Sequence, residues 1–131
     1  HHLARYPLAD LFLDTVPYGA HTTASDALWM GVPLITCRGE TFAARVAASL
    51  LTAAGLGDLV TASLDDYERL ALRLARDPTE LAALKQRLAA ARSTAPYFDL
   101  PRFTRNLESL YARIWRRHLT GEPPAPITAP E

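Results

Sequence analysis

Short apolar runs alternate with amphipathic segments along the first half of the chain. A continuous apolar run predicts a buried strand, and apolar residues spaced three and four apart predict a helix. Strands are therefore expected over 8–14, 32–37 and 58–61, the first of them buried on both faces. Helices are expected from Thr22 or Thr23 to Gly31 and over 42–54, 64–76, 78–92 and 102–118. This alternation predicts an α/β fold with parallel strands, followed by C-terminal helices.

Glycine, proline and capping residues fall at the ends of these predicted helices. Gly31 suits the position after a helix end because glycine adopts a positive φ at little steric cost, and Pro33 cannot continue the helix. Thr41 and Ser63 suit N-caps because a hydroxyl oxygen accepts a hydrogen bond from a free amide of the first turn. Three strands make a small sheet with an unpaired edge, so we expect the chain to be the C-terminal part of a longer protein.

The composition narrows the class of protein. The chain has 131 residues, 49% of them hydrophobic, with 14 basic and 14 acidic side chains. Zero net charge argues against nucleic acid as a partner, and no apolar run reaches the roughly 18 residues that a membrane helix needs. The single cysteine, Cys37, fits a reducing, cytoplasmic location, and no Cys/His spacing predicts a metal site. The prolines that follow Gly121 predict a disordered tail over 121–131.

The candidate site lies at the start of the first long helix. Ligands of open parallel sheets bind beyond the carboxyl ends of the strands, which is where the loop before Thr22 is expected. Backbone N–H groups at a helix N-terminus lack intrahelical partners and favour a phosphate group. His21, Thr22 and Thr23 add side-chain donors, and Asp26 shares a helix face with the threonines, where it could accept hydrogen bonds from ribose hydroxyls.

Each of these residues also has a simpler structural interpretation. Thr22 and Thr23 are good caps, Asp26 complements the helix dipole, and His21 suits a polar loop. The tryptophans and the leucine stripes are typical of a core, and Cys37 is typical of a small buried side chain.

The combined strings are more specific than these single residues. LDTVPYGAHTTASDALWMGVPLIT, GETFAARVAASLLTAAGLGDLV, DDYERLALRLARD and FTRNLESLYARIWRRH resemble the C-terminal end of the catalytic region in the O-GlcNAc transferase family, which includes SPINDLY-like proteins with tetratricopeptide repeats. The resemblance implies a partial Rossmann-like domain over 1–120, the C-terminal half of a glycosyltransferase with two such domains. It also implies an inverting hexosyltransferase that moves GlcNAc from UDP-GlcNAc to Ser or Thr of an acceptor protein, without a cofactor or metal.

The same resemblance assigns His21, Thr22 and Thr23 to the diphosphate and Asp26 to the ribose of the donor. His21, Asp26, the Gly39–Thr41 segment and Arg45 resemble the GlcNAc branch more than a sister branch that transfers fucose from a GDP donor. The catalytic domain, the base-reading segment and the phosphate-binding lysine of the family have no counterpart in these residues, so the chain alone is expected to be inactive.

Two other classes of protein stay open at this point. The first alternative is a degenerate, non-catalytic protein-interaction module, which the amphipathic segments 78–92 and 102–118 favour. The apolar stripe of 102–118 could also drive a homodimer. The second alternative is another nucleotide-sugar enzyme of the same architecture, such as an epimerase.

Overall fold

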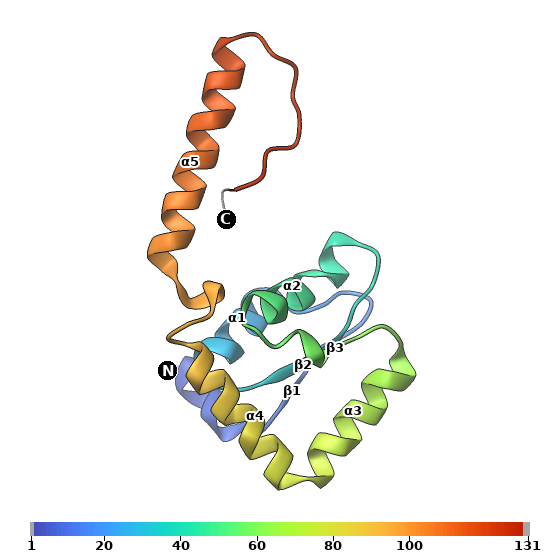
Figure 1. The fold of residues 1–131 in the computed structure, drawn as a ribbon. Helices are drawn as coiled ribbons and strands as arrows, with labels where there is room; N and C mark the ends of the chain where they lie inside the picture. Colours follow the sequence, from blue (N-terminus) through green and yellow to red (C-terminus); the bar gives the residue numbers. More distant parts are fainter. Residues whose placement is uncertain (1, 130–131) are drawn as a thin grey trace. The chain divides into compact units, whose positions relative to one another are not determined.

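The computed structural model describes residues 2–129, so His1 and the last two residues of the predicted tail lie outside the described part. The chain forms two compact units, His1–Phe98 and Asp99–Glu131 (Figure 1). The first unit holds the sheet and four of the long helices, and the second holds the last helix and the tail.

The sheet of the first unit has three short strands in the order β1-β2-β3. β1 is Phe12–Leu13, β2 is Leu34–Cys37 and β3 is Val60–Thr61. Both pairings are parallel, with Phe12 opposite Leu34 and Thr36 opposite Val60. The parallel sheet and its crossover helices confirm the predicted α/β fold.

Helices cover both faces of the sheet (Figure 1). α1 (Thr22–Trp29) and α2 (Val46–Ala53) contact one another and β2, whereas α3 (Leu64–Arg76) contacts β2 from the other side and α4 (Pro78–Ala91) packs on α3. Four 3-10 helices complete the unit: η1 (Leu3–Leu8), η2 (Phe42–Ala44), η3 (Gly57–Leu59) and η4 (Pro96–Phe98).

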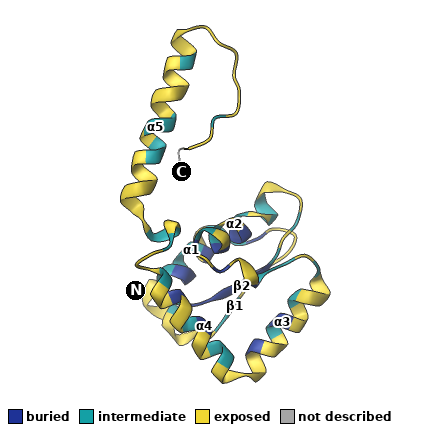
Figure 2. Ribbon diagram, in the orientation of Figure 1, coloured by how far each residue is buried: buried dark blue, intermediate teal, exposed yellow. Residues whose placement is uncertain are grey.

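The core lies between these layers, and Figure 2 shows that its buried residues gather on β2 and on the inner sides of the helices around the sheet. Its largest fully buried aliphatic side chains come from all four helices, from β2, and from the turns after α1 and after α2. They are Leu28, Val32, Leu34, Ile35, Leu51, Leu56, Leu74 and Leu88. Burial of a Leu or Ile side chain contributes roughly 1.5–3 kcal/mol, so these residues supply most of the hydrophobic stabilisation.

Most predicted helix boundaries agree with the structure because the capping residues act as expected. Gly31 and Gly55 adopt φ values of 81° and 74° after their helices. The side chains of Thr41 and Ser63 accept hydrogen bonds from the amides of Ala44 and Asp66.

The first strand is much shorter than predicted. Leu8 ends the 3-10 helix η1 and is 87% exposed, and only Phe12 and Leu13 pair with β2. Leu13 is 54% exposed, so the prediction of a strand buried on both faces was wrong. β1 has a neighbour on one side alone in the described sheet, and an edge strand is covered less than a central one.

The second predicted helix and the third predicted strand also begin later than expected. Residues 42–44 form the 3-10 helix η2, and α2 starts at Val46, after Arg45. In the same way, η3 occupies residues 57–59, and β3 starts at Val60.

The second unit consists of α5 (Leu100–Leu119) and the tail that follows it. The helix begins where the Asp99 side chain accepts a hydrogen bond from the amide of Arg102. No residue of α5 is buried, and Trp115 is 60% exposed, so the expectation that Trp115 belongs to the core was wrong. After Gly121 the tail runs back along the helix, where the Arg113 guanidinium donates to the carbonyl oxygen of Thr128 at 2.6 Å (Figure 1).

Candidate functional site

The loop that follows β1 is held by the carboxylate of Asp14. This side chain is 7% exposed and accepts hydrogen bonds from the amides of Thr15 and Ala20 at 2.8 and 2.6 Å and from the hydroxyl of Thr36 at 2.6 Å. The Tyr67 hydroxyl of α3 donates to the backbone carbonyl of Asp14 at 2.8 Å. Asp14 therefore joins the entry to α1 to β2 and α3.

Gly19 brings the same loop against the neighbouring segment. Its amide donates to the carbonyl oxygen of Ala43 at 3.1 Å. A Cβ atom at Gly19 would lie 3.1 Å from both that oxygen and a carboxylate oxygen of Asp14. Loop and η2 can approach this closely because glycine has no side chain.

α1 starts directly after this loop, at the carboxyl edge of the sheet. Its first residues, Thr22 and Thr23, are exposed. Among residues 2–129, the backbone N–H groups of the exposed Thr22 and Thr23 donate to no protein acceptor. The helix N-terminus therefore presents unpaired amides and partial positive charge to solvent, which suits an anion.

His21 lies on the η2 side of the helix start. Its ring stacks on Tyr18, with centroids 5.3 Å apart and planes at 16°, and meets Phe42 edge to face at 5.8 Å. Its Nε2 atom lies 3.3 Å from the carbonyl oxygen of Ala43. A neutral ring that donates there keeps Nδ1 as an acceptor, whereas a protonated ring has Nδ1 free to donate to an anion.

Asp26 lies one helical turn beyond Thr22 and faces the η1 side of the helix. Its carboxylate is 3.8 Å from Nε2 of His2. Burial, and then the negative charge of Asp26, raise the pKa of Tyr6 in η1. Thr22 and Thr23 are thus exposed on the first turn, Asp26 lies near His2, and the His21 ring lies against η2; the joint role of these residues in ligand binding stays a prediction.

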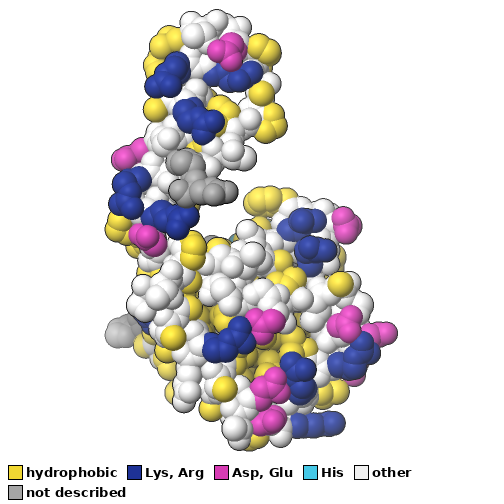
Figure 3. All heavy atoms as spheres, viewed as in Figure 1, with side chains coloured by type: hydrophobic (Ala, Val, Ile, Leu, Met, Phe, Trp, Pro, Cys, Tyr) yellow, Lys and Arg dark blue, Asp and Glu magenta, His cyan; other side chains and the backbone are white. Residues whose placement is uncertain are grey.

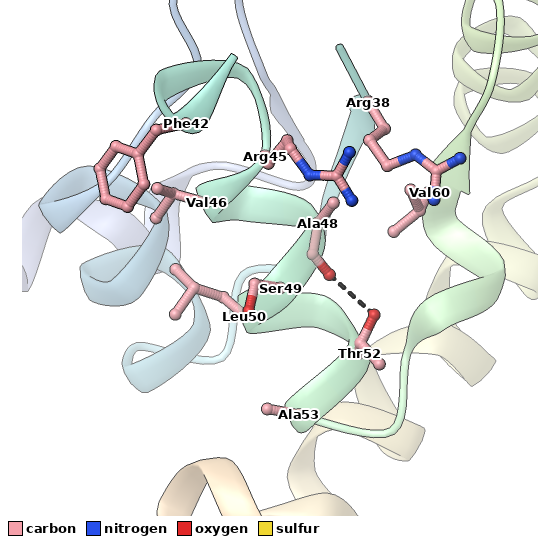
Figure 4. Close-up of a pocket in the computed structure, with 10 residues that line it drawn as sticks. All are labelled: Arg38, Phe42, Arg45, Val46, Ala48, Ser49, Leu50, Thr52, Ala53 and Val60. Carbon is pink, nitrogen blue, oxygen red and sulfur yellow. Dashed lines mark hydrogen bonds between the residues drawn. The ribbon is translucent and has the colours of Figure 1, made fainter. Parts of the chain in front are cut away.

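A pocket adjoins this region on the other side of Phe42. It has a volume of about 780 Å³ and lies between α2 and β3, with Arg38 and Arg45 among its lining residues (Figure 4). None of the predicted site residues lines it, and Phe42 links it to His21.

Sequence reasoning missed several of these features. Asp14 was assigned to a strand, although an acid at the end of an apolar run is a signal of a buried hydrogen-bond acceptor. The partners of His21, namely Tyr18 and Phe42, come from two separate loops, and no local pattern brings them together. Cys37 is half-buried rather than fully buried.

The comparison with known proteins places the chain in a family of transferases. Residues 1–107 match Glycosyl transferase family 41, and the chain therefore belongs to this family. It is 45% identical over 124 residues to the probable UDP-N-acetylglucosamine–peptide N-acetylglucosaminyltransferase SPINDLY of Oryza sativa subsp. japonica. It is also 45% identical over 124 residues to the protein SEC of Arabidopsis thaliana, which carries the same enzyme name.

These alignments cover 95% and 94% of the chain and 13% of each relative, so the chain spans about an eighth of those proteins. A solved structure agrees: a lysine-to-methionine variant of the Thermobaculum terrenum O-GlcNAc transferase superposes with a TM-score of 0.80 at 43% identity. That match covers 88% of this chain and 22% of the other. The resemblance to O-GlcNAc transferases and the predicted fold class are thereby confirmed.

Within residues 2–129, no group of three or more His, Cys, Asp or Glu side chains is arranged to hold a metal ion. No helix among the described residues is both long and apolar enough to cross a membrane.

Proposed function

We propose that the chain forms part of the donor-nucleotide site of a protein O-GlcNAc transferase, namely the part that holds the diphosphate and the ribose. The observation that carries this proposal is the start of α1, where exposed threonines and unpaired amides lie at the carboxyl edge of a parallel sheet. The relatives named as UDP-N-acetylglucosamine–peptide transferases support UDP-GlcNAc as the donor and a polypeptide as the acceptor.

In this proposal each site residue meets one part of the donor. The amides and hydroxyls of Thr22 and Thr23 bind the diphosphate, and His21 donates to the same group from the η2 side. Asp26 accepts hydrogen bonds from the ribose hydroxyls. The helix N-terminus and the imidazole, rather than a metal ion, thus face the negative charge of the donor.

The chain alone is proposed to bind the donor without transferring the sugar. It spans only 13% of its curated relatives, and transfer to Ser or Thr requires groups that stabilise the leaving diphosphate in the transition state. Transfer, the tetratricopeptide repeats and a cytoplasmic location are accordingly proposed for the whole protein.

UDP binding to the 131-residue chain tests the donor site directly. Binding to the folded state alone raises stability by about 2.7 kcal/mol at a UDP concentration of 100 times Kd, so the melting temperature should rise with UDP. Asp26→Asn should weaken binding by about tenfold or more, since one hydrogen bond to a charged group is worth roughly 1.5–3 kcal/mol and about 1.4 kcal/mol is tenfold. Asp65→Asn, in the first turn of α3, is the matched control and should bind UDP like the wild type.

The amide NMR signals identify the binding surface. UDP should move the signals of Thr22, Thr23 and Ala24 more than those of the first turn of α3. A chain that melts at the same temperature with and without UDP, or whose α1 signals stay unmoved, would contradict the proposal.

The exposed face of α5 favours a second candidate function, self-association. Phe103, Tyr111, Ile114 and Trp115 are all more than half exposed. Exposed apolar side chains at helical spacing form a patch that another α5 could cover, which would give a homodimer. Sedimentation should then show a dimer that Trp115→Ser weakens, and a monomer at all concentrations would refute this second proposal.

A further inference from the structure

The pocket between α2 and β3 combines two arginines with an apolar wall. Arg38 follows β2, and Arg45 stands between η2 and α2. Figure 4 shows both arginine side chains near the start of α2, with that of Arg38 extending toward Val60. The side chains of Val46, Leu50 and Val60 line it as well.

In the described part of the chain, neither guanidinium of this pair has a hydrogen-bonding or ionic partner. Among residues 2–129, Arg38 and Arg45 make no salt bridge, and their side chains donate no hydrogen bond to a protein atom; the neighbouring Glu40 pairs with neither. Five other basic residues of the described chain do pair with carboxylates: Arg69, Arg73, Lys85, Arg87 and Arg117. Figure 3 likewise shows basic and acidic side chains adjoining one another over much of this face. Both side chains are exposed, so an anion bound there would gain charge-assisted donors without first breaking an ion pair.

The chemistry of the pocket favours a carboxylate attached to an apolar neighbour. A guanidinium donates through a planar fork that matches the two oxygens of a carboxylate. The volume of about 780 Å³ is larger than a small free anion would fill, and such an anion would leave the apolar wall uncovered. An acidic side chain next to an aliphatic one, as in a polypeptide, would satisfy both the charges and the wall.

The position of the pocket relates it to the candidate donor site. Phe42 lines the pocket and is 80% exposed, and its ring also meets the His21 ring at 5.8 Å. A chain bound along α2 would therefore lie one aromatic ring away from the residue proposed to face the diphosphate. We infer that Arg38 and Arg45 form a specificity site that binds an acidic side chain of the acceptor polypeptide, an inference that rests on the proposed function.

Two matched peptides test this inference on the 131-residue chain. The first is a blocked heptapeptide with one glutamate between two valines, and the second has glutamine in place of the glutamate. The glutamate peptide should bind about tenfold more tightly, and it should move the Nε–Hε NMR signals of Arg38 and Arg45. Arg38→Met and Arg45→Met should each remove most of that preference, whereas Arg76→Met, an equal change of charge outside the pocket, should retain it.

A UDP titration of the same samples separates this inference from the donor-site proposal. UDP should move the signals of Thr22 and Thr23 and leave those of Arg38 and Arg45 in place. Equal affinity for the two peptides, or the same loss in Arg76→Met as in Arg38→Met, would overturn the inference while leaving the donor site intact. Displacement of the glutamate peptide by UDP would also overturn it, because the arginines would then belong to a nucleotide site. Peptide binding without any UDP response would instead refute the donor-site proposal alone.

Discussion

Replacing Asp14 by alanine removes the acceptor of three hydrogen bonds at the centre of the first unit. The donors are the amides of Thr15 and Ala20 and the hydroxyl of Thr36. Thr15 is exposed, so its amide can turn to water. Thr36 is only 1% exposed and Ala20 is partly buried, so these two donors would be left without an acceptor.

The expected loss in the free energy of unfolding comes from the two donors that are left without an acceptor. A hydrogen bond to a charged group contributes roughly 1.5–3 kcal/mol, and a buried donor left unsatisfied costs a similar amount. Asp14→Ala should therefore lower the free energy of unfolding by about 3–5 kcal/mol, a large part of the 5–15 kcal/mol typical of a domain. Thr36→Val removes one bond and leaves the carboxylate with two others, so about 1–2 kcal/mol is expected.

Urea unfolding followed by circular dichroism measures these differences. Asp10→Ala is the control, because Asp10 pairs with Lys85 at the surface, with its side chain 79% exposed, and an exposed pair contributes about 1 kcal/mol or less. The reasoning would be refuted if Asp14→Ala unfolded within about 1 kcal/mol of the wild type, or if Thr36→Val cost as much as Asp14→Ala.

Two smaller predictions concern pairs that hold α4 and η4. Hydrogen bonds of 2.8 and 2.9 Å from Arg87 lower the pKa of Asp58, so this pair stabilises the fold above the unfolded-state pKa of about 3.9, and its contribution is lost as pH falls through the folded pKa. Since both side chains are about half exposed, Arg87→Ala should cost less than about 1 kcal/mol at neutral pH in urea unfolding, and a cost that persists below the folded pKa of Asp58 would contradict the assignment. Tyr97→Phe removes a 2.6 Å hydrogen bond to the hydroxyl of Ser25 and should cost about 1 kcal/mol. A double-mutant cycle with Ser25→Ala checks this, and a coupling free energy of zero would show that the hydroxyl pair adds nothing.

The parts of the fold that depend on local chemistry could be predicted from the sequence. The end of α1 before Gly31 and the starts of α3 and α4 follow from capping residues that act within a few positions of themselves. The length of β1 depends instead on how many residues of β2 lie opposite it. Continuous apolarity from Leu8 to Leu13 carries no information about that partner, and the predicted strand was therefore too long.

The candidate site likewise has features that the nearby sequence predicts and features that depend on distant residues. The helix start at Thr22 and the exposure of Thr22 and Thr23 follow from sequence near that point. The contacts of His21 with Phe42 and the joint position of Arg38 and Arg45 depend on how the segment 38–45 folds between β2 and α2. Because that segment consists of a loop and the short 3-10 helix η2 rather than part of a long helix, periodicity could not place its side chains.

The returning tail has a consequence for whatever binds α5. Arg113 and Arg117 donate to the carbonyl oxygens of Thr128 and Pro123, so the proline-rich segment already occupies one side of that helix. Prolines limit the conformations of the released segment, which reduces the entropy lost when it lies down again. A partner must therefore approach α5 from its uncovered side or peel the segment away, and shortening the tail would change how readily the helix is recognised.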